Sequence, residues 1–262
     1  MLNETTTDSG MRIWHARPDD TDTPRPVVLL LHERYGPVEH TFNVLERFAK
    51  SGFVAAMPDL FYRYKGDRGE VERAEARVEV TDTETITDID ATLAYLRSLP
   101  YVDGTQVGVS GFCLSGRTPI VYAAARPDDV SAISVTHGGI YPRDYNGDTP
   151  GQAPVGGLIP QLACPVLGMF GENDRLVPME NIRRFRSELE RTGANYWVRV
   201  FADTPHGWMN TTNSAIFREA PSETAWETLA EFYSGVFAGA WDKGNRTWRF
   251  EPDAALNHDF SC

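Results

Sequence analysis

One ten-residue stretch, residues 107–116, constrains the fold of this chain more than any other. It reads Val-Gly-Val-Ser-Gly-Phe-Cys-Leu-Ser-Gly. The alternating β-branched residues predict a strand, the glycine after them predicts a sharp turn, and the following segment is typical of a helix. A strand, a sharp turn and a helix with Cys113 at the apex form the plan of a nucleophile elbow, here with Cys in place of Ser.

Small residues flank Cys113 where such an elbow needs them. A strained elbow leaves no room for bulky side chains two positions before and after its apex, and these residues are Gly111 and Ser115. An apex at Ser115 would place Arg117 at one of these positions, and Arg117 is too large. We therefore expect Cys113 to be the apex, with a buried structural Cys at a strand end as the alternative.

Apolar runs and helical patterns alternate along the rest of the chain. Continuous or alternating apolar runs predict strands over residues 25–31, 53–57, 130–135, 165–170 and 196–201. Apolar spacings of three and four predict helices over residues 41–51, 86–99, 182–189 and 225–237. This alternation predicts one α/β domain in which a mostly parallel sheet is covered by helices on both faces.

The ends of the chain and one internal segment differ from this pattern. Residues 1–10 are polar, and we expect a disordered lead-in rather than a signal peptide. Residues 11–240 form the predicted domain, beginning with a weak edge strand over 11–17. Residues 137–160 are rich in Gly, Pro, Asp and Asn, and predict a loop over the active site. Residues 241–262 carry aromatic side chains and are expected to pack on the body.

Charge and cysteine content narrow the function classes. A net charge of −12 disfavours binding to nucleic acid or to an anionic membrane surface. No window approaches the run of about 18 apolar residues that spans a bilayer. Three cysteines, Cys113, Cys164 and Cys262, do not suggest a disulfide framework, so we expect a reducing, cytoplasmic setting. Whether the chain is a monomer or a homodimer stays open.

Three of the predicted strands are each followed by a reactive residue, in the order Cys, Asp, His along the chain. Cys113 follows the elbow strand, Asp174 follows the strand at 165–170, and His206 follows the strand at 196–201. Ligands of parallel sheets bind at the carboxyl ends of the strands, and nucleophile, acid, base is the chain order of the α/β-hydrolase triad. A thiol needs an imidazole to take its proton, and the imidazole needs a carboxylate to orient it.

Two other acids lie close to this predicted triad. Glu172 is two residues before Asp174, and Asp203 is three residues before His206. Asp203 is poorly placed to reach a histidine in the same tight loop. Asp174 is preferred because the apolar residues after it, ending in Pro178, suggest a fixed loop that enters a helix.

Backbone amides are expected to form the oxyanion hole. One amide should come from Leu114, directly after the nucleophile, and the other from Arg34, in the loop after the first buried strand. Glu33 in that loop is unusual, because a carboxylate beside an oxyanion hole and a thiol is electrostatically costly. The alternative is that Glu33 points to solvent or pairs with a surface arginine.

These residues together resemble the dienelactone hydrolase (carboxymethylenebutenolidase) family of α/β-hydrolases. The matching pieces span roughly residues 11–240 and are Gly111–Gly116, the Asp174 loop, His206-Gly207-Trp208, Glu33 and Asp59-Leu60-Phe61-Tyr62-Arg63. The resemblance implies a Cys113 thiol that is held near Glu33 at rest. Substrate binding would turn Glu33 so that it helps to deprotonate the thiol, and Arg63 would bind a substrate carboxylate.

The chain departs from the family pattern in three places. Ser115 stands where the family usually has Gly, and Asn210 stands where the family has a second carboxylate-binding Arg. The segment 137–160 is longer than the family implies and could reshape the pocket. Tyr35, Phe112 and Trp208, with Phe61, Tyr62 and Tyr141, would supply aromatic pocket walls or simply belong to the core.

The sequence predicts a hydrolase that acts on a small ester or lactone, either neutral or anionic, through a thioester. We expect no metal and no organic cofactor, because His32, His40 and His137 lack metal-ligand spacing. One alternative is a lyase, isomerase or cyclase on the same scaffold, which would use these residues without hydrolysis. The other is a binding protein that kept the fold without catalysis.

Overall fold

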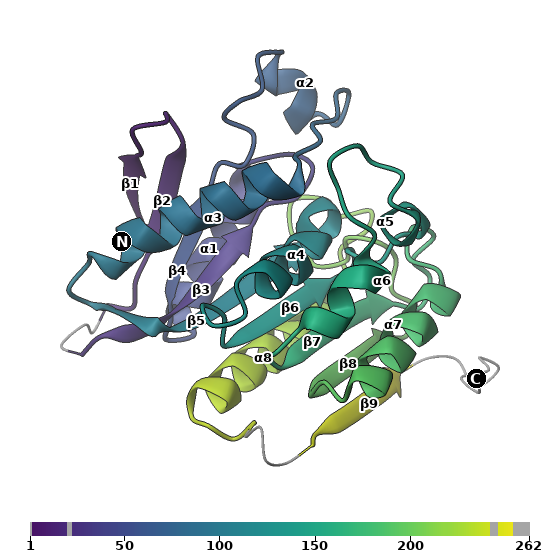
Figure 1. The fold of residues 1–262 in the computed structure, drawn as a ribbon. Helices are drawn as coiled ribbons and strands as arrows, with labels where there is room; N and C mark the ends of the chain where they lie inside the picture. The colour runs from purple at the N-terminus through teal and green to yellow at the C-terminus, as the bar shows by residue number, and fades with distance from the viewer. Residues whose placement is uncertain (1, 20–22, 242–245, 254–262) are drawn as a thin grey trace.

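The computed structural model describes residues 2–19, 23–241 and 246–253, and in this part of the chain nine strands form one sheet (Figure 1). The strand order is β1-β2-β4-β3-β5-β6-β7-β8-β9. From β4 to β9 all neighbours are parallel, whereas β2 is antiparallel to β1 and β4. The strands are β1 (Leu2–Thr6), β2 (Arg12–Ala16), β3 (Arg25–Leu31), β4 (Val54–Pro58), β5 (Val102–Phe112), β6 (Ala132–Thr136), β7 (Val166–Gly171), β8 (Tyr196–Phe201) and β9 (Trp248–Asp253).

Helices cover both faces of the sheet, which confirms the predicted α/β fold (Figure 1). Apolar residues of α1 (Glu39–Lys50) and α8 (Glu219–Phe237) pack on one face, with Phe48 and Trp226 in contact. Apolar residues of α3 (Asp82–Arg97), α4 (Thr118–Ala125) and α7 (Met179–Thr192) pack on the other. Within the described ranges, no helix is both long enough and apolar enough to cross a membrane.

Local signals explain where these helices begin and end. The side chain of Thr81 accepts a hydrogen bond from the amide of Glu84, and the carboxylate of Glu84 accepts one from the amide of Thr81. This capping box starts α3. Gly193 ends α7 in the left-handed conformation with φ of +74°, which a residue without Cβ adopts at little cost.

The two ends of the sheet differ from the sequence-based prediction. Residues 1–10 are not a disordered lead-in over their described length, because Leu2–Thr6 form β1. The strand β2 is therefore not at the edge, and Trp14 on β2 donates to Glu4 on β1 at 2.8 Å. Pairing with β2 holds the mostly polar residues of β1 as a strand. A prediction based on apolar periodicity does not detect such a strand.

The segment after residue 241 contributes one further strand, β9. It pairs in parallel with β8, and the ring of Trp248 stacks on that of Tyr196 at 6.3 Å. Trp241 packs edge-on against Phe232 of α8 at 5.2 Å. Packing on the body therefore holds for these residues, while 242–245 and 254–262 lie outside the described residues.

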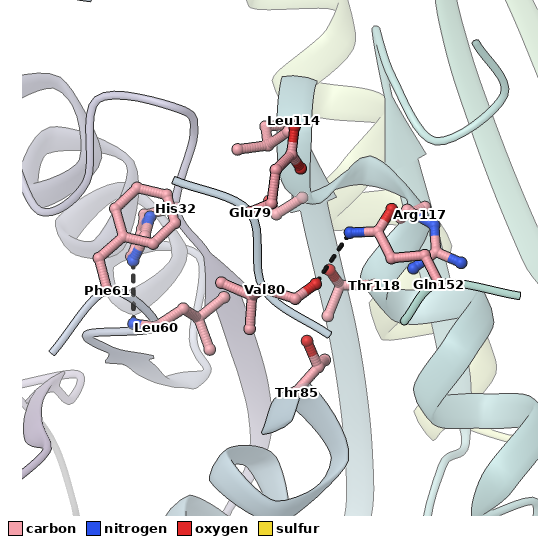
Figure 2. A pocket seen from close by; sticks show the side chains of 11 residues that line it. His32, Leu60, Phe61, Glu79, Val80, Thr85, Leu114, Arg117, Thr118 and Gln152 are labelled. Atoms are coloured by element: carbon pink, nitrogen blue, oxygen red, sulfur yellow. Dashed lines mark hydrogen bonds between the residues drawn. The ribbon is translucent and has the colours of Figure 1, made fainter. Parts of the chain in front are cut away.

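The segment 137–160 is ordered by two short helices, α5 (Pro142–Asn146) and α6 (Val155–Leu158). Figure 2 shows Gln152 of this segment donating to the carbonyl oxygen of Val80, at 2.8 Å. Arg117, directly after the elbow, donates to Ala153 O at 2.7 Å and also pairs with Asp82. These contacts anchor the segment to α3 and to the elbow.

Arg117 and Gln152 also line a small cavity of about 30 Å³. Figure 2 shows the side chains around it. Such a volume holds about one water molecule. Leu114 borders both this cavity and the larger pocket at Cys113. The anchored segment thus lies directly against the elbow.

Candidate active site

Cys113 lies at a sharp turn between β5 and α4, with a positive φ of +51°. Such a φ strains a residue that has a Cβ. The turn leaves no room around it, since a Cβ on Gly111 would lie 2.3 Å from Ser115 O. A Cβ on Gly138, which follows β6, would lie 1.9 Å from Cys113 O. Two strand ends therefore interlock at the cysteine.

Ser115 adds a contact that the sequence did not suggest. Its hydroxyl lies 2.6 Å from the carbonyl oxygen of Leu31 at the end of β3, and it accepts from the amide of Phe112 at 3.2 Å. Beyond being small enough, this residue ties the elbow to the neighbouring strand. A glycine at this position could not make either bond.

Three side chains from three strand ends form one hydrogen-bonded chain. Nε2 of His206 lies 3.1 Å from Sγ of Cys113, and its Nδ1 lies 2.8 Å from Oδ2 of Asp174. Oδ1 of Asp174 accepts from the amides of Leu176 and Val177 at 2.8 and 3.2 Å, which fixes the carboxylate. This arrangement can move a proton from the sulfur to the imidazole and hold the resulting charge.

The surroundings of His206 favour its protonated form. Burial alone lowers the pKa of His206, but the hydrogen bonds to Asp174 and Cys113 outweigh it and raise that pKa to about 10. An imidazolium 3.1 Å away stabilises the negative charge that develops on the sulfur when the thiol gives up its proton.

The two alternative acids have other partners. Oε2 of Glu172 accepts from the backbone amide of Asp203 at 2.9 Å, so Glu172 holds the loop that carries His206. Asp203 is exposed and has a positive φ of +50°. The structure thus brings only Asp174 of these three acids onto His206.

Glu33 contacts two histidines in the interior of the protein. Its side chain is buried, and Oε1 lies 3.0 Å from Nε2 of His137, while Oε2 lies 3.9 Å from Nε2 of His40. Burial raises the pKa of Glu33, but the hydrogen bond from His137 and the nearby imidazoles outweigh it and lower the pKa to about 2. The polar contacts of Cys113 Sγ are with His206 and Tyr141 instead. Among the described residues no hydrogen bond joins Glu33 to Cys113, and a thiol held near Glu33 at rest stays a prediction.

His32 orders the loop that carries Glu33 and Arg34. Its Nε2 accepts from the amide of Leu60 at 3.0 Å, so Nδ1 carries the hydrogen and donates to Glu33 O at 3.0 Å. The sequence marked this histidine only as one without metal-ligand spacing. Among the described residues, no group of three or more His, Cys, Asp and Glu could hold a metal ion.

A pocket of about 500 Å³ opens above Cys113 and is rich in arginine. Such a volume is ordinary for a small-molecule site. Its lining consists of Arg34, Arg77, Cys113, Leu114, Tyr141, Pro142, Arg143, Asp148, Arg175 and Leu176. Four guanidinium groups meet one lining carboxylate here, on a chain whose net charge is −12. The segment 137–160 supplies part of this wall, with Tyr141, Pro142, Arg143 and Asp148.

Comparison with known proteins identifies the family of this chain. The model of the dienelactone hydrolase family matches residues 11–237. The chain belongs to the dienelactone hydrolase family. It is thereby a hydrolase of the kind that acts on esters or lactones, which confirms the class predicted from the sequence.

Relatives with similar sequences include an Escherichia coli (strain K12) protein named "Putative carboxymethylenebutenolidase". It is 28% identical over 229 residues, which cover 86% of this chain and 82% of the relative. A Synechocystis protein of the same name is 27% identical over 216 residues, covering 79% of this chain and 85% of its own.

Solved structures show the same fold. A Klebsiella pneumoniae structure described as a "Putative Dienelactone Hydrolase" superimposes with a TM-score of 0.79 at 22% identity, covering 89% of this chain and 98% of that one. Est1E from Butyrivibrio proteoclasticus gives a TM-score of 0.67 at 16% identity, covering 90% and 99%.

Arg63 does not lie where this dienelactone hydrolase family member would need it as an anion clamp. Both of its terminal nitrogens donate to the carboxylate of Asp88, at 2.6 and 2.8 Å. Arg63 is not among the residues that line the Cys113 pocket. The prediction that Arg63 binds substrate is therefore not supported, and four other arginines occupy the pocket.

Three further predicted substrate contacts belong to the interior. Phe112 and Trp208 are nearly fully buried and pack edge-on against His137, at 5.9 and 5.2 Å. Asn210 is buried and accepts from the amide and hydroxyl of Thr212, which makes it a turn residue. None of the three lines the pocket. The residue types at these three positions did not indicate whether the side chains would face the pocket or the interior.

Tyr141 lies beside the cysteine, whereas Tyr35 is not among the residues that line the pocket. Burial, and then the negative charges of Glu33 and Cys113, raise the pKa of Tyr35, which is half-buried. The hydroxyl of Tyr141 lies 3.8 Å from Sγ of Cys113. Sequence reasoning treated Tyr141 only as one of several aromatic residues, and nothing in its local pattern marked it out.

Proposed function

We propose that this protein hydrolyses a small anionic ester or lactone through a thioester formed on Cys113. The observation that carries the proposal is the unbroken contact from Cys113 Sγ through His206 to Asp174, at the floor of a pocket lined by four arginines. Family membership supports the hydrolase class, and the geometry supports Cys113 as the group that attacks.

Acylation begins from the sulfur and imidazole of this contact. The Cys113 thiolate attacks the substrate carbonyl carbon, and negative charge moves to the carbonyl oxygen. The backbone amides of Leu114 and Arg34 are the proposed donors to that oxygen. His206 then gives its proton to the leaving alkoxide, and Asp174 holds the ring in the correct orientation.

Hydrolysis of the thioester reverses these roles. His206 takes a proton from water as the hydroxide attacks the thioester carbonyl, and collapse of the intermediate returns the electron pair to sulfur. The contact at 3.1 Å supports His206, and not Glu33, as this base. Glu33 keeps its charge through the hydrogen bond from His137.

The arginines support an anionic substrate. Arg143 and Arg175 both line the pocket. Arg143 already pairs with Glu79 at 3.2 Å, so Arg175 is the preferred partner of a substrate carboxylate, which a guanidinium binds with two parallel hydrogen bonds. These residues take the place that the resemblance assigned to Arg63. Leu176 is 53% exposed and adds apolar surface to the pocket next to Arg175.

The test follows turnover of 4-nitrophenyl esters in H₂¹⁸O. The proposal expects one ¹⁸O in the acid product, a mass increase on Cys113 equal to the acyl group, and loss of both in Cys113→Ala. Retained hydrolysis in Cys113→Ala would overturn the nucleophile. Turnover without ¹⁸O would instead indicate a lyase, isomerase or cyclase, and failure to acylate any ester would indicate a binding protein.

A further inference from the structure

Tyr141 brings a second polar group to the sulfur of Cys113. Its hydroxyl lies 3.8 Å from Sγ, within the range of hydrogen bonds to sulfur, and 3.3 Å from the carbonyl oxygen of His137. A phenol has a single hydrogen, so it donates to only one of these acceptors at a time. The hydroxyl can therefore respond to charge on the sulfur by turning toward it.

The ring of Tyr141 is held in place by its surroundings. Its amide donates to Oδ2 of Asp144 at 3.1 Å, and Pro142 follows as the first residue of α5. The guanidinium of Arg143 lies 5.4 Å from the ring centroid, and the ring of His206 lies 6.2 Å away. With 7% of the residue exposed, the hydroxyl is fixed near the sulfur and has little competition from water.

The hydroxyl stays protonated. Burial, followed by the negative charge of Cys113 and the hydrogen bond to it, raises the pKa of Tyr141 well above its ordinary value. Tyr141 therefore keeps its hydrogen and can donate it at neutral pH, and it does not compete with His206 as a base.

We propose that Tyr141 is a catalytic residue whose hydroxyl donates to the Cys113 sulfur whenever that sulfur carries negative charge. The assignment rests on the thioester mechanism proposed above. Sulfur is negative in two states, the resting thiolate and the thiolate that leaves the acyl-enzyme. While the sulfur is acylated and neutral, the hydroxyl turns to His137 O.

The leaving step is where this donor speeds the reaction. Water adds to the thioester carbonyl and gives one proton to His206, forming a tetrahedral intermediate. The C–S bond then breaks, its electron pair returns to sulfur, and the carbonyl of the acid product reforms. The thiolate is left beside the imidazolium of His206 and the hydroxyl of Tyr141, so no further reactant is needed.

The test compares Tyr141→Phe with Tyr145→Phe. Tyr145 is the matched control, because it lies in α5, the short helix that Tyr141 directly precedes, and is equally buried, but packs against Arg184. Two quantities are measured, the pH midpoint of Cys113 alkylation by iodoacetamide and the rate at which acetyl-Cys113 formed from 4-nitrophenyl acetate hydrolyses. A hydrogen bond to a charged group predicts an upward shift of about one pH unit and about tenfold slower hydrolysis in Tyr141→Phe alone.

Each outcome decides the question. Wild-type values of both quantities in Tyr141→Phe, or equal changes in Tyr145→Phe, would overturn the role of Tyr141. Replacing residue 141 by 3-fluorotyrosine keeps the hydroxyl and makes it a stronger donor, so the midpoint should shift downward even if Tyr141→Phe folds poorly. Alkylation needs no turnover, so hydrolysis that persists in Cys113→Ala would overturn the proposed function while the alkylation result still judges Tyr141.

Discussion

Oε1 of Glu33 lies 3.0 Å from Nε2 of His137, and this pair keeps a carboxylate ionised inside the protein. A buried charge without a partner is strongly destabilising. Both the stability and the titration of this pair can be measured.

Replacing Glu33 by Gln should change how stability depends on pH. The folded pKa of Glu33, about 2, lies below its ordinary value of 4.5. The ionised group therefore stabilises the fold above 4.5, and this contribution is lost as the pH falls through the folded value. The shift corresponds to about 3 kcal/mol. Urea unfolding at a series of pH values should show a shallower acid loss in Glu33→Gln; parallel curves would contradict the assignment.

Replacing His137 by Phe should destabilise the protein by about 3–5 kcal/mol, because it leaves the Glu33 carboxylate buried without its hydrogen bond. The double variant with Glu33→Gln should recover part of that loss, since it removes the charge. Denaturant midpoints of the two single variants and the double variant form the test. Strict additivity of the two changes would show that the contact contributes nothing.

Gly111→Ala should weaken the elbow. A Cβ there would lie 2.3 Å from Ser115 O, so the turn must shift, at about 1–3 kcal/mol. Esterase activity should fall further than stability alone explains, because Cys113 moves away from His206. Gly157→Ala is the control, since a Cβ at that position meets no atom within 4 Å. Thermal unfolding and turnover are measured on both variants, and equal effects would refute the steric argument.

Arg175→Met should raise KM about tenfold for an ester that carries a carboxylate, such as mono-4-nitrophenyl glutarate, and leave KM for neutral 4-nitrophenyl pentanoate unchanged. Arg63→Met is the control, because Arg63 pairs with Asp88 and is not part of the pocket lining. Steady-state kinetics of both variants on both esters decide whether Arg175 or Arg63 binds the substrate carboxylate. A selective effect of Arg63 instead would restore the anion clamp that the family resemblance implied.

Asp174→Asn should lower turnover by about 10³- to 10⁴-fold, because His206 loses the acceptor that orients it. The folded pKa of His206, about 10, lies above its ordinary 6.5, so its stabilising contribution is complete below 6.5 and is lost as the pH rises through 10. The stability difference between wild type and Asp174→Asn should therefore shrink as the pH rises. A difference that stays constant across this range would argue against the pair.

The sequence by itself determined the architecture of the sheet and which three residues, Cys113, His206 and Asp174, are joined by hydrogen bonds. Buried apolar runs that alternate with helical spacings leave few folds other than a parallel sheet covered on both faces. Since strand ends meet at one edge of such a sheet, the positions of Cys113, Asp174 and His206 after three strands were enough to bring them together. The lack of space for a side chain at position 111 identified Cys113 as the apex of the elbow, and this too is a property of the local sequence.

Only the tertiary structure decided which side chains surround the sulfur. Arg63 and Arg175 are both arginines near the end of a strand, yet one binds Asp88 and the other lines the pocket. Glu33 contacts His137, which lies more than a hundred residues away in the chain. Tyr141 contacts Cys113 because of how the 137–160 segment folds. Such choices depend on competition between partners distant in sequence. The local pattern of apolar residues does not depend on that competition, so it cannot predict these partners. It does predict which residues are buried, and burial determines the sheet.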